Sequence, residues 1–205
     1  MKKIVLLIIA LISINSFAQT EKGKIYIGAS SNLNFNAIST KNVSSNFTSE
    51  TKNSRFAVSP QIGYFLADNF LTGLEANLSF STFKNNNSKE NQNTYIISPF
   101  IKYYFTKKNI KPFVKAKYGF GKLNTSNSFN PVNSIIPKTD IQTYSFGGGL
   151  AYFINNFIAI ELNLEYYSME FNTSLSVNQN NIVTSSKQTQ TDTGFNSNIG
   201  FSIFL

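Results

Sequence analysis

Apolar and polar residues alternate along eight segments of the chain. In the segment that begins at Phe70, for example, Leu74 and Leu78 alternate with Glu75 and Asn77. A period of two is typical of β-strands with two unlike faces. We expect these strands at about residues 24–36, 56–66, 70–80, 95–105, 114–120, 144–152, 158–166 and 195–205. Four intervening stretches rich in Ser, Thr and Asn are predicted to be long polar loops, at residues 38–54, 84–93, 122–141 and 168–190.

A short motif marks the other connections. Segments 63–70, 103–110 and 151–157 each end a strand with adjacent aromatic residues, pass through a few turn residues, and open the next strand with Asn and a large apolar residue. The copies are 40 and 48 residues apart, which is too long for one strand pair and fits two strands with two connections. The chain is therefore predicted to be a series of β-hairpins joined alternately by short turns and long loops.

The two strand faces distinguish a membrane barrel from a soluble one. The apolar face carries no charged residue over the predicted strands, and the opposite face is mostly Gly, Ser, Asn and Ala. Aromatic residues gather at both strand ends, as expected of rings at the two interfaces of a bilayer. These features favour an all-β, eight-stranded antiparallel up-and-down transmembrane β-barrel with short periplasmic turns and long extracellular loops. The alternative is a soluble sandwich or lipocalin-like barrel.

Two prolines lie inside predicted strands. Pro60 and Pro99 cannot donate a hydrogen bond to a neighbouring strand, and a closed barrel has no free edge to hold them. We therefore expect a β-bulge at each proline.

The N-terminus has the features of a secretory signal peptide. Two lysines precede an apolar run over residues 4–14, and residues 16–18 have the small-x-small form of a cleavage site. The run is short of the ~20 residues that a membrane-spanning helix needs. We predict a cleaved signal peptide over residues 1–18 and a single outer-membrane β-barrel domain over residues 19–205. Since the chain has no cysteine, we expect neither a lipoprotein anchor nor disulfides.

The charge balance indicates a membrane partner. Without the two N-terminal lysines the chain has 16 basic and 10 acidic side chains, a net charge of +6. An exported chain has little access to nucleic acid, and no helix-turn-helix pattern is present. The expected partners are therefore outer-membrane lipid and lipopolysaccharide. Basic residues of the predicted loops could meet its phosphates or serve solubility alone; they are Lys41, Lys52, Arg55, Lys84, Lys89, Lys122, Lys138 and Lys187.

Three runs of the sequence resemble a known group of proteins. The runs Ser98–Phe105, Gly63–Asn69 and Lys111–Ala116 look like the small outer-membrane β-barrel proteins of Bacteroidota-type bacteria, within the broad OmpA/OmpX/OmpW-like group. The resemblance spans residues 19–205 and is architectural, with no catalytic motif. It implies an outer-membrane location and insertion by the outer-membrane assembly machinery through the C-terminal strand. Strands of that group typically end in an aromatic residue, whereas this chain ends in Phe204-Leu205.

Residue types that support catalysis or metal binding are scarce. The chain has no histidine and no cysteine, which excludes Ser-His and Cys-His nucleophiles and most zinc sites. The run Gly147–Gly149 lies within a predicted strand, so crowding explains it better than phosphate binding. A hydrolase built on Glu161 and Glu165 is disfavoured, because nothing around them resembles a substrate cleft. We therefore expect no enzymatic activity, no cofactor and no metal site.

Charged residues also occur on the predicted lumen face, and they are Glu75, Lys102, Lys115, Lys117, Glu161 and Glu165. Those nearest the short turns are expected roughly 10–18 Å inside the barrel, at ~3.3 Å rise per residue and ~40° tilt. Buried charges need partners. One interpretation is an interior salt-bridge network that seals the barrel, and the other is a gated or narrow polar path lined by the same residues.

Three functions are open at this point. The first is a non-enzymatic, monomeric outer-membrane barrel with a structural or surface-interaction role through its extracellular loops and a lumen sealed by side chains. The second is a narrow channel or transporter for small or apolar solutes. The third is a soluble periplasmic ligand-binding barrel.

Overall fold

The computed structural model describes residues 20–32, 37–44, 47–84, 89–105, 109–127, 138–179 and 182–205. The predicted signal peptide over residues 1–18 lies outside the described residues. Within the described ranges, no helix is long and apolar enough to cross a membrane.

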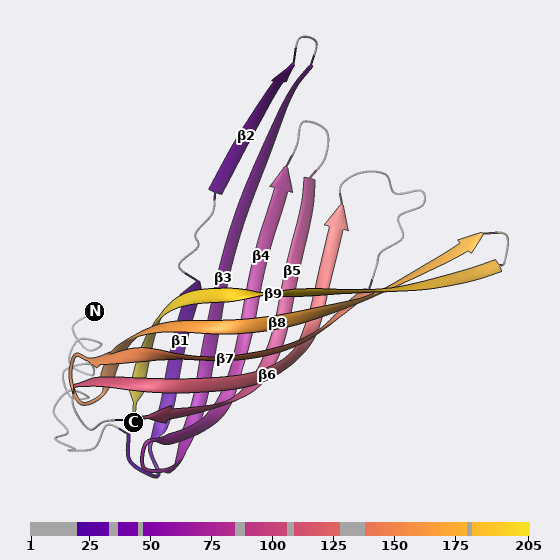
Figure 1. Cartoon of the computed structure of the whole chain (residues 1–205). Coiled ribbons are helices and arrows are strands. Elements are labelled where there is room, and N and C mark those ends of the chain that lie inside the picture. The colour runs from indigo at the N-terminus through magenta and orange to yellow at the C-terminus, as the bar shows by residue number, and fades with distance from the viewer. Residues whose placement is uncertain are drawn as a thin grey trace, which may run out of the picture.

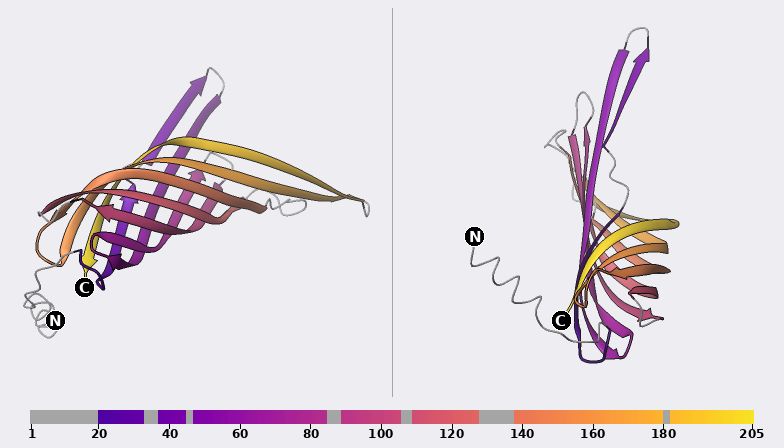
Figure 2. Two further views of the ribbon diagram at one scale, coloured as in Figure 1. Left: turned by 60° about the horizontal axis from the view of Figure 1, so that its bottom comes forward. Right: turned by 90° about the vertical axis from the view of Figure 1, so that its left-hand side faces the viewer.

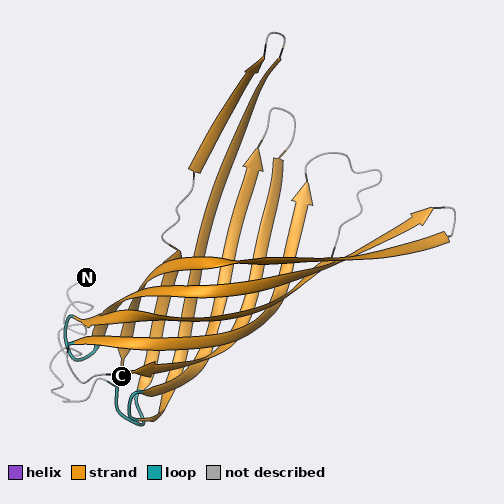
Figure 3. Cartoon of the chain, in the orientation of Figure 1, coloured by secondary structure: helices purple, strands orange, loops and turns teal. Residues whose placement is uncertain are grey.

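The described residues form nine antiparallel β-strands (Figure 1; Figure 3). They are β1 (Ile25–Asn32), β2 (Ala37–Ser44), β3 (Phe47–Ala67), β4 (Phe70–Lys84), β5 (Lys89–Tyr104), β6 (Ile110–Asn127), β7 (Lys138–Phe153), β8 (Ile158–Gln179) and β9 (Ile182–Phe204). Each strand from β3 onward pairs with the next, and β1 pairs with both β9 and β3, so the sheet closes on itself. β1 and β2 pair with successive parts of β3 and together fill one position around the barrel. The nine strands therefore occupy eight strand positions. The predicted eight-stranded up-and-down barrel is confirmed.

The apolar strand face points outward and the polar face points into the lumen. Leu74 is 53% exposed, whereas its neighbour Glu75 is 2% exposed. The outward residues of β4 from Phe70 to Phe80 cover about 25 Å along the barrel axis, at ~3.3 Å rise and ~40° tilt. That height matches the apolar band of an outer-membrane barrel. A water-soluble barrel would bury this face, so the soluble alternative does not fit.

Most residues of the predicted long loops instead form hairpins that extend the barrel strands. The pairing of β2 with β3 runs from Ala37–Ser54 to Ser44–Phe47, and β8 pairs with β9 as far as Gln179–Ile182. Figure 2 shows these two hairpins projecting beyond the barrel in different directions. The loop prediction was wrong because these segments are rich in polar residues and lack the apolar–polar alternation, while backbone hydrogen bonds form whatever the side chains are.

The first barrel position is interrupted between β1 and β2. Ser30 lies opposite Ser59, and Ala37 lies opposite Ser54. Ala37 is seven residues after Ser30, whereas Ser54 is only five residues before Ser59, so the chain between β1 and β2 has two residues more than the matching part of β3. β9 pairs with β1 only as far as Asn198, and beyond that point its described pairing is with β8 alone. The β8–β9 hairpin can therefore diverge from the β2–β3 hairpin, as Figure 1 shows.

The expected β-bulges at Pro60 and Pro99 are not formed. The β3–β4 pairs on either side of Pro60 keep one register, and so do the β5–β6 pairs on either side of Pro99. On its other edge Pro60 pairs with Ala29, and Pro99 pairs with Leu74. Since proline removes a donor from one edge only, the ladder omits the contact at that edge and resumes unchanged. No inserted residue is needed.

The residues that follow the predicted signal peptide bind the short-turn end of the barrel. The Thr20 hydroxyl donates to Asn69 Oδ1 at 2.6 Å, and the Asn69 amide donates to the Thr20 carbonyl at 2.6 Å. Asn69 has a φ of 64°, a left-handed conformation that asparagine tolerates in tight turns. At the other end of the chain, the Leu205 amide donates to the Ile25 carbonyl at 2.8 Å. Both ends of the barrel domain are thus held at one rim.

Candidate functional site

A cluster of aromatic side chains plugs the lumen at the short-turn end. In the sequence motif that precedes each short turn, the adjacent aromatic residues point to opposite faces, with Tyr64 46% exposed and Phe65 0% exposed. Tyr103 and Tyr104 divide in the same way, and so do Tyr152 and Phe153. The aromatic plug comprises Tyr26, Phe65, Leu71, Phe100, Tyr104, Phe113, Ala151, Phe153, Ala159 and Phe204.

Phe204 is central to the aromatic plug. Its ring centroid lies 4.8 Å from that of Phe153 and 5.4 Å from that of Tyr26. Lumen-facing glycines leave space for other rings of the plug: a Cβ on Gly149 would lie 2.6 Å from the Phe113 ring. Small residues on this face are therefore required by the packing of the plug.

Next to the aromatic plug, Lys102 of β5 and Glu161 of β8 form a buried ion pair. Lys102 Nζ lies 2.7 Å from Glu161 Oε2, and the two side chains are 1% and 8% exposed. Glu161 Oε1 also accepts hydrogen bonds from the hydroxyls of Tyr104, at 2.9 Å, and Ser202, at 3.3 Å. Lys102 Nζ lies 4.6 Å from the centre of the Phe113 ring. Carboxylate, hydroxyl and aromatic partners thus replace the water that both charges lose on burial.

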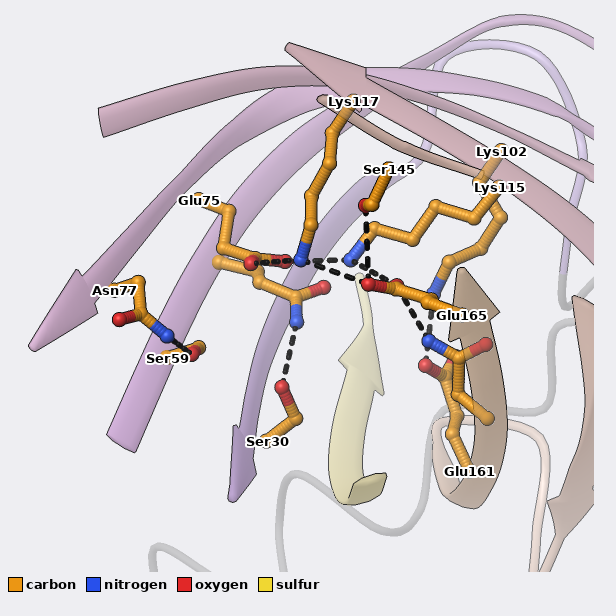
Figure 4. Close-up of polar contacts among 12 residues, drawn as sticks. Ser30, Ser59, Glu75, Asn77, Lys102, Lys115, Lys117, Ser145, Glu161 and Glu165 are labelled. Atoms are coloured by element: carbon orange, nitrogen blue, oxygen red, sulfur yellow. Dashed lines mark hydrogen bonds and ion pairs between the residues drawn. The ribbon is translucent and has the colours of Figure 1, made fainter. Parts of the chain in front are cut away.

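A second cluster of charges lies beside this pair (Figure 4). Glu75 of β4 accepts from Lys115 Nζ at 2.5 Å and from Lys117 Nζ at 2.6 Å, both on β6. Lys117 Nζ also reaches Glu165 of β8 at 3.0 Å, and the Ser145 hydroxyl donates to Glu165 at 3.2 Å. This cluster connects β4, β6 and β8 across the lumen.

The strand register explains how these charges meet. Lys102 and Lys115 lie directly opposite each other on β5 and β6, yet each turns to a different carboxylate. Gly147 lies between Lys115 and Glu165 in the register of β6, β7 and β8, and its lack of a side chain leaves room for their approach to 3.9 Å. The two clusters together hold three ammonium groups and three carboxylates. They balance in charge, and we call them the charge network.

The lumen is hollow on the hairpin side of the charge network. A cavity of about 210 Å³ there is bordered by Glu75, Lys117 and Glu165. Arg55, Tyr167 and Asp192 also line it. Arg55 was assigned to a loop from the sequence, but it belongs to β3 and faces the lumen. The lumen is thus packed toward the short turns and open toward the hairpins.

The structure brings together all six charged residues that the sequence placed on the lumen face, Glu75, Lys102, Lys115, Lys117, Glu161 and Glu165. Sequence reasoning missed their hydroxyl partners Tyr104, Ser145 and Ser202, and it missed the aromatic plug. A signal for both was present, because these residues occupy inward-facing positions of strands whose outward positions were assigned correctly.

The charge network pairs each of its charges with an opposite charge. Each of the three carboxylates has an ammonium nitrogen within 3.0 Å. Among the described residues, no group of three or more acidic side chains could hold a metal ion. The arrangement can obstruct the lumen and fix the relative positions of β4, β5, β6 and β8.

Comparisons with known proteins agree with this architecture. OprG of Pseudomonas aeruginosa has a similar structure, with a TM-score of 0.55 and 14% identity over 93% of this chain and 99% of OprG. The outer membrane protein AlkL in lipid bilayers is also similar, with a TM-score of 0.51 and 16% identity over 94% of each chain. No curated protein matches the chain in sequence. The family model of the outer membrane protein beta-barrel domain matches residues 4–186, and the chain therefore belongs to this family of outer-membrane barrels.

Proposed function

We propose that this protein is a non-enzymatic outer-membrane barrel with a sealed lumen, and that it has a structural or surface-interaction role through its extracellular hairpins. The observation that carries the proposal is the succession of two obstructions inside the barrel. The aromatic plug fills the lumen near the short turns, and the charge network crosses it at the next level. Side chains suffice to fill the interior of an eight-stranded barrel.

The hairpins support a role at the cell surface. β2–β3 and β8–β9 extend beyond the apolar band, and their sequences are rich in polar residues. Surface segments held by a rigid scaffold are where binding residues commonly lie. The packed barrel would then serve as the anchor for these hairpins.

The second candidate is a narrow channel or transporter for small or apolar solutes. The cavity of about 210 Å³ favours it, because a hollow half already leads from the hairpin side to Lys117, Glu75 and Glu165. Such a path would need the charge network to rearrange and the aromatic plug to move. The sealed barrel needs neither change, and we prefer it for that reason.

We also propose how the protein is exported and which group of bacteria it comes from, on the basis of the sequence features given above. A signal peptide over residues 1–18 would be cleaved on export, and the C-terminal strand would engage the outer-membrane assembly machinery. Outer-membrane lipid and lipopolysaccharide would surround a monomeric barrel. The three runs beginning at Gly63, Ser98 and Lys111 support an origin in Bacteroidota-type bacteria.

Single-channel recording in planar lipid bilayers separates the two functions. The unaltered protein is expected to give no steady current. Glu75→Ala leaves Lys115 and Lys117 without their shared carboxylate but keeps the aromatic plug, so a sealed barrel with this substitution should also give no steady current. Lys122→Gln is the matched control, because Lys122 is exposed and pairs across the ladder with Asp140, away from the network. Steady currents from the unaltered protein that change in Glu75→Ala or Lys115→Ala would establish the channel instead.

A further inference from the structure

The cavity on the hairpin side of the charge network has an apolar wall on β8. Tyr167, Met169 and Phe171 line it, because they continue the inward-facing position of Glu165 at a spacing of two. All three side chains are half-buried. Two aromatic rings and a thioether in an otherwise polar lumen form a surface suited to an apolar or aromatic ligand group. We call this cavity the lumen pocket.

Another side of the lumen pocket carries a cation, Arg55 of β3. β3 and β8 lie three strand positions apart around the barrel, so Arg55 reaches the pocket from a different direction than the apolar wall does. Arg55 Nε donates to Ser79 Oγ at 3.3 Å, and within the described ranges Arg55 forms no ion pair. The two terminal nitrogens of its guanidinium group can therefore bind a ligand. A carboxylate matches these two donors in the bidentate geometry that arginine favours.

The other charges around the lumen pocket direct an anion to Arg55. Glu75, Lys117 and Glu165 border the pocket on the side of the short turns, and they belong to the charge network, which is balanced. Asp192 of β9 also lines the pocket and is exposed. Its carboxylate repels an anion on the β9 side, whereas Arg55 attracts one on the β3 side. A carboxylate in the pocket therefore has one favoured position.

The size of the lumen pocket limits the ligand to about one ring. An apolar cavity of ~150 Å³ holds one benzene molecule. At about 210 Å³ the lumen pocket has room for such a ring with a short acidic arm. A fused polycyclic acid or a long-chain fatty acid would not fit.

We propose that the lumen pocket binds a small aromatic carboxylate. The carboxylate group lies against Arg55, and the ring lies against Tyr167, Met169 and Phe171. The ligand enters from the hairpin side, toward which the lumen is open, and leaves by the same way. Binding needs no path through the aromatic plug, so the inference differs from the channel considered above and goes beyond the proposed structural role.

Titration with phenylacetate tests the proposal, and a methionine methyl resonance reports binding. The chain has two methionines, Met1 and Met169, so an isotope label on methionine methyl groups observes the apolar wall directly. Phenylacetate added to folded protein in zwitterionic detergent micelles is expected to give a saturable ring-current shift of the Met169 resonance. Arg55→Gln should weaken binding at least about tenfold, because a charge-assisted hydrogen bond is lost. The matched control Lys122→Gln removes an exposed cation outside the pocket and should leave the affinity unchanged.

A second variant tests the space itself. Ala57 lines the lumen pocket and is half-buried. Ala57→Phe fills the pocket and leaves Arg55 in place, so phenylacetate should no longer shift the Met169 resonance. The mobility of unboiled samples on gels shows whether each variant is folded.

Two analogues of the probe decide the outcome without any substitution. Phenylacetamide and phenethylamine keep the ring and replace the carboxylate by a neutral amide and by an ammonium group. Each should bind at least about tenfold more weakly than phenylacetate. A shift that does not saturate, unchanged affinity in folded Arg55→Gln, or an analogue that binds as tightly as phenylacetate would overturn the proposal. Steady single-channel currents would refute the sealed lumen without affecting this inference.

Discussion

Removal of one partner of the Lys102–Glu161 ion pair is expected to destabilise the barrel strongly. Lys102→Met would leave the Glu161 carboxylate, 8% exposed, without its ammonium group. Glu161→Gln would leave the Lys102 ammonium group, 1% exposed, with the Tyr26 hydroxyl, aromatic rings and a neutral amide but no carboxylate. Breaking a buried pair from one side typically costs about 3–5 kcal/mol, because an uncompensated charge stays behind.

The geometry supports a cost of this size. At 2.7 Å and an effective dielectric constant of ~20, the attraction between the two charges is about 6 kcal/mol. Hydrogen bonds from Tyr104 and Ser202 continue to stabilise Glu161 after Lys102 is removed, at about 1.5–3 kcal/mol for a bond to a charged group. These bonds are present with or without Lys102, so they do not enter the difference. The substitution also removes the desolvation cost of the Lys102 ammonium group, which brings the loss of unfolding free energy below the full attraction, to the expected value of about 3–5 kcal/mol per single variant.

The double variant Lys102→Met/Glu161→Gln measures the interaction energy between the two side chains apart from their contacts with other residues. It leaves no uncompensated charge, so its cost should not exceed that of either single variant, and the coupling energy should be about 3 kcal/mol. Urea unfolding in lipid vesicles, followed by the mobility difference between folded and unfolded protein on unboiled gels, measures each free energy. The exposed Lys122→Gln control should change it by no more than about 0.5 kcal/mol. Additive single variants, or single variants that each cost under about 1 kcal/mol, would refute the reasoning.

Two further predictions concern the aromatic plug. Gly149→Leu should lower the yield of folded barrel, because its Cβ would lie 2.6 Å from the Phe113 ring and would contact the Leu162 carbonyl, whereas Gly148→Ala, with its nearest neighbour at 3.0 Å, should fold. Equal yields on unboiled gels would contradict this account of the lumen glycines. Phe204→Ala should lower the unfolding free energy by about 3–5 kcal/mol, because Phe204 is 1% exposed within the plug. Leu205→Ala is its control, at 46% exposure; similar urea midpoints for both variants would show that Phe204 does not support the plug.

The fold could be predicted because a membrane barrel imposes a strict rule on its strands. Lipid on one side and a narrow lumen on the other give every residue between Phe70 and Phe80 a definite environment. Leu74 can therefore be assigned to the lipid face and Glu75 to the lumen face from residue type alone. The same rule placed Lys102 and Glu161 inside the barrel. Which carboxylate each lysine meets depends on register across the lumen, and alternation along one strand cannot specify that.

Beyond the membrane the rule no longer applies. The segments that form β2 and the far part of β9 are rich in Ser, Thr, Asn and Gln, and their sequence shows neither period nor apolar stripe, although their backbones form regular ladders. The aromatic plug was missed for a related reason. Near the short turns both faces are apolar, and neighbours such as Tyr64 and Phe65 conceal the alternation that separates lipid from lumen.

Closure of the sheet has a consequence for assembly of the protein. β1 meets β9 through contacts such as Tyr26–Phe204, which joins residues 178 positions apart. Lys102 of β5 and Glu161 of β8 lie on strands three positions apart, and they meet because the sheet curls into a tube. An open, partly inserted sheet would therefore present this lysine and this glutamate unpaired to hydrocarbon, where each such charge is costly. Pairing of these charges thus stabilises only the closed barrel. Insertion and closure should therefore occur together. A chain that lacks its last strand should not insert into the bilayer.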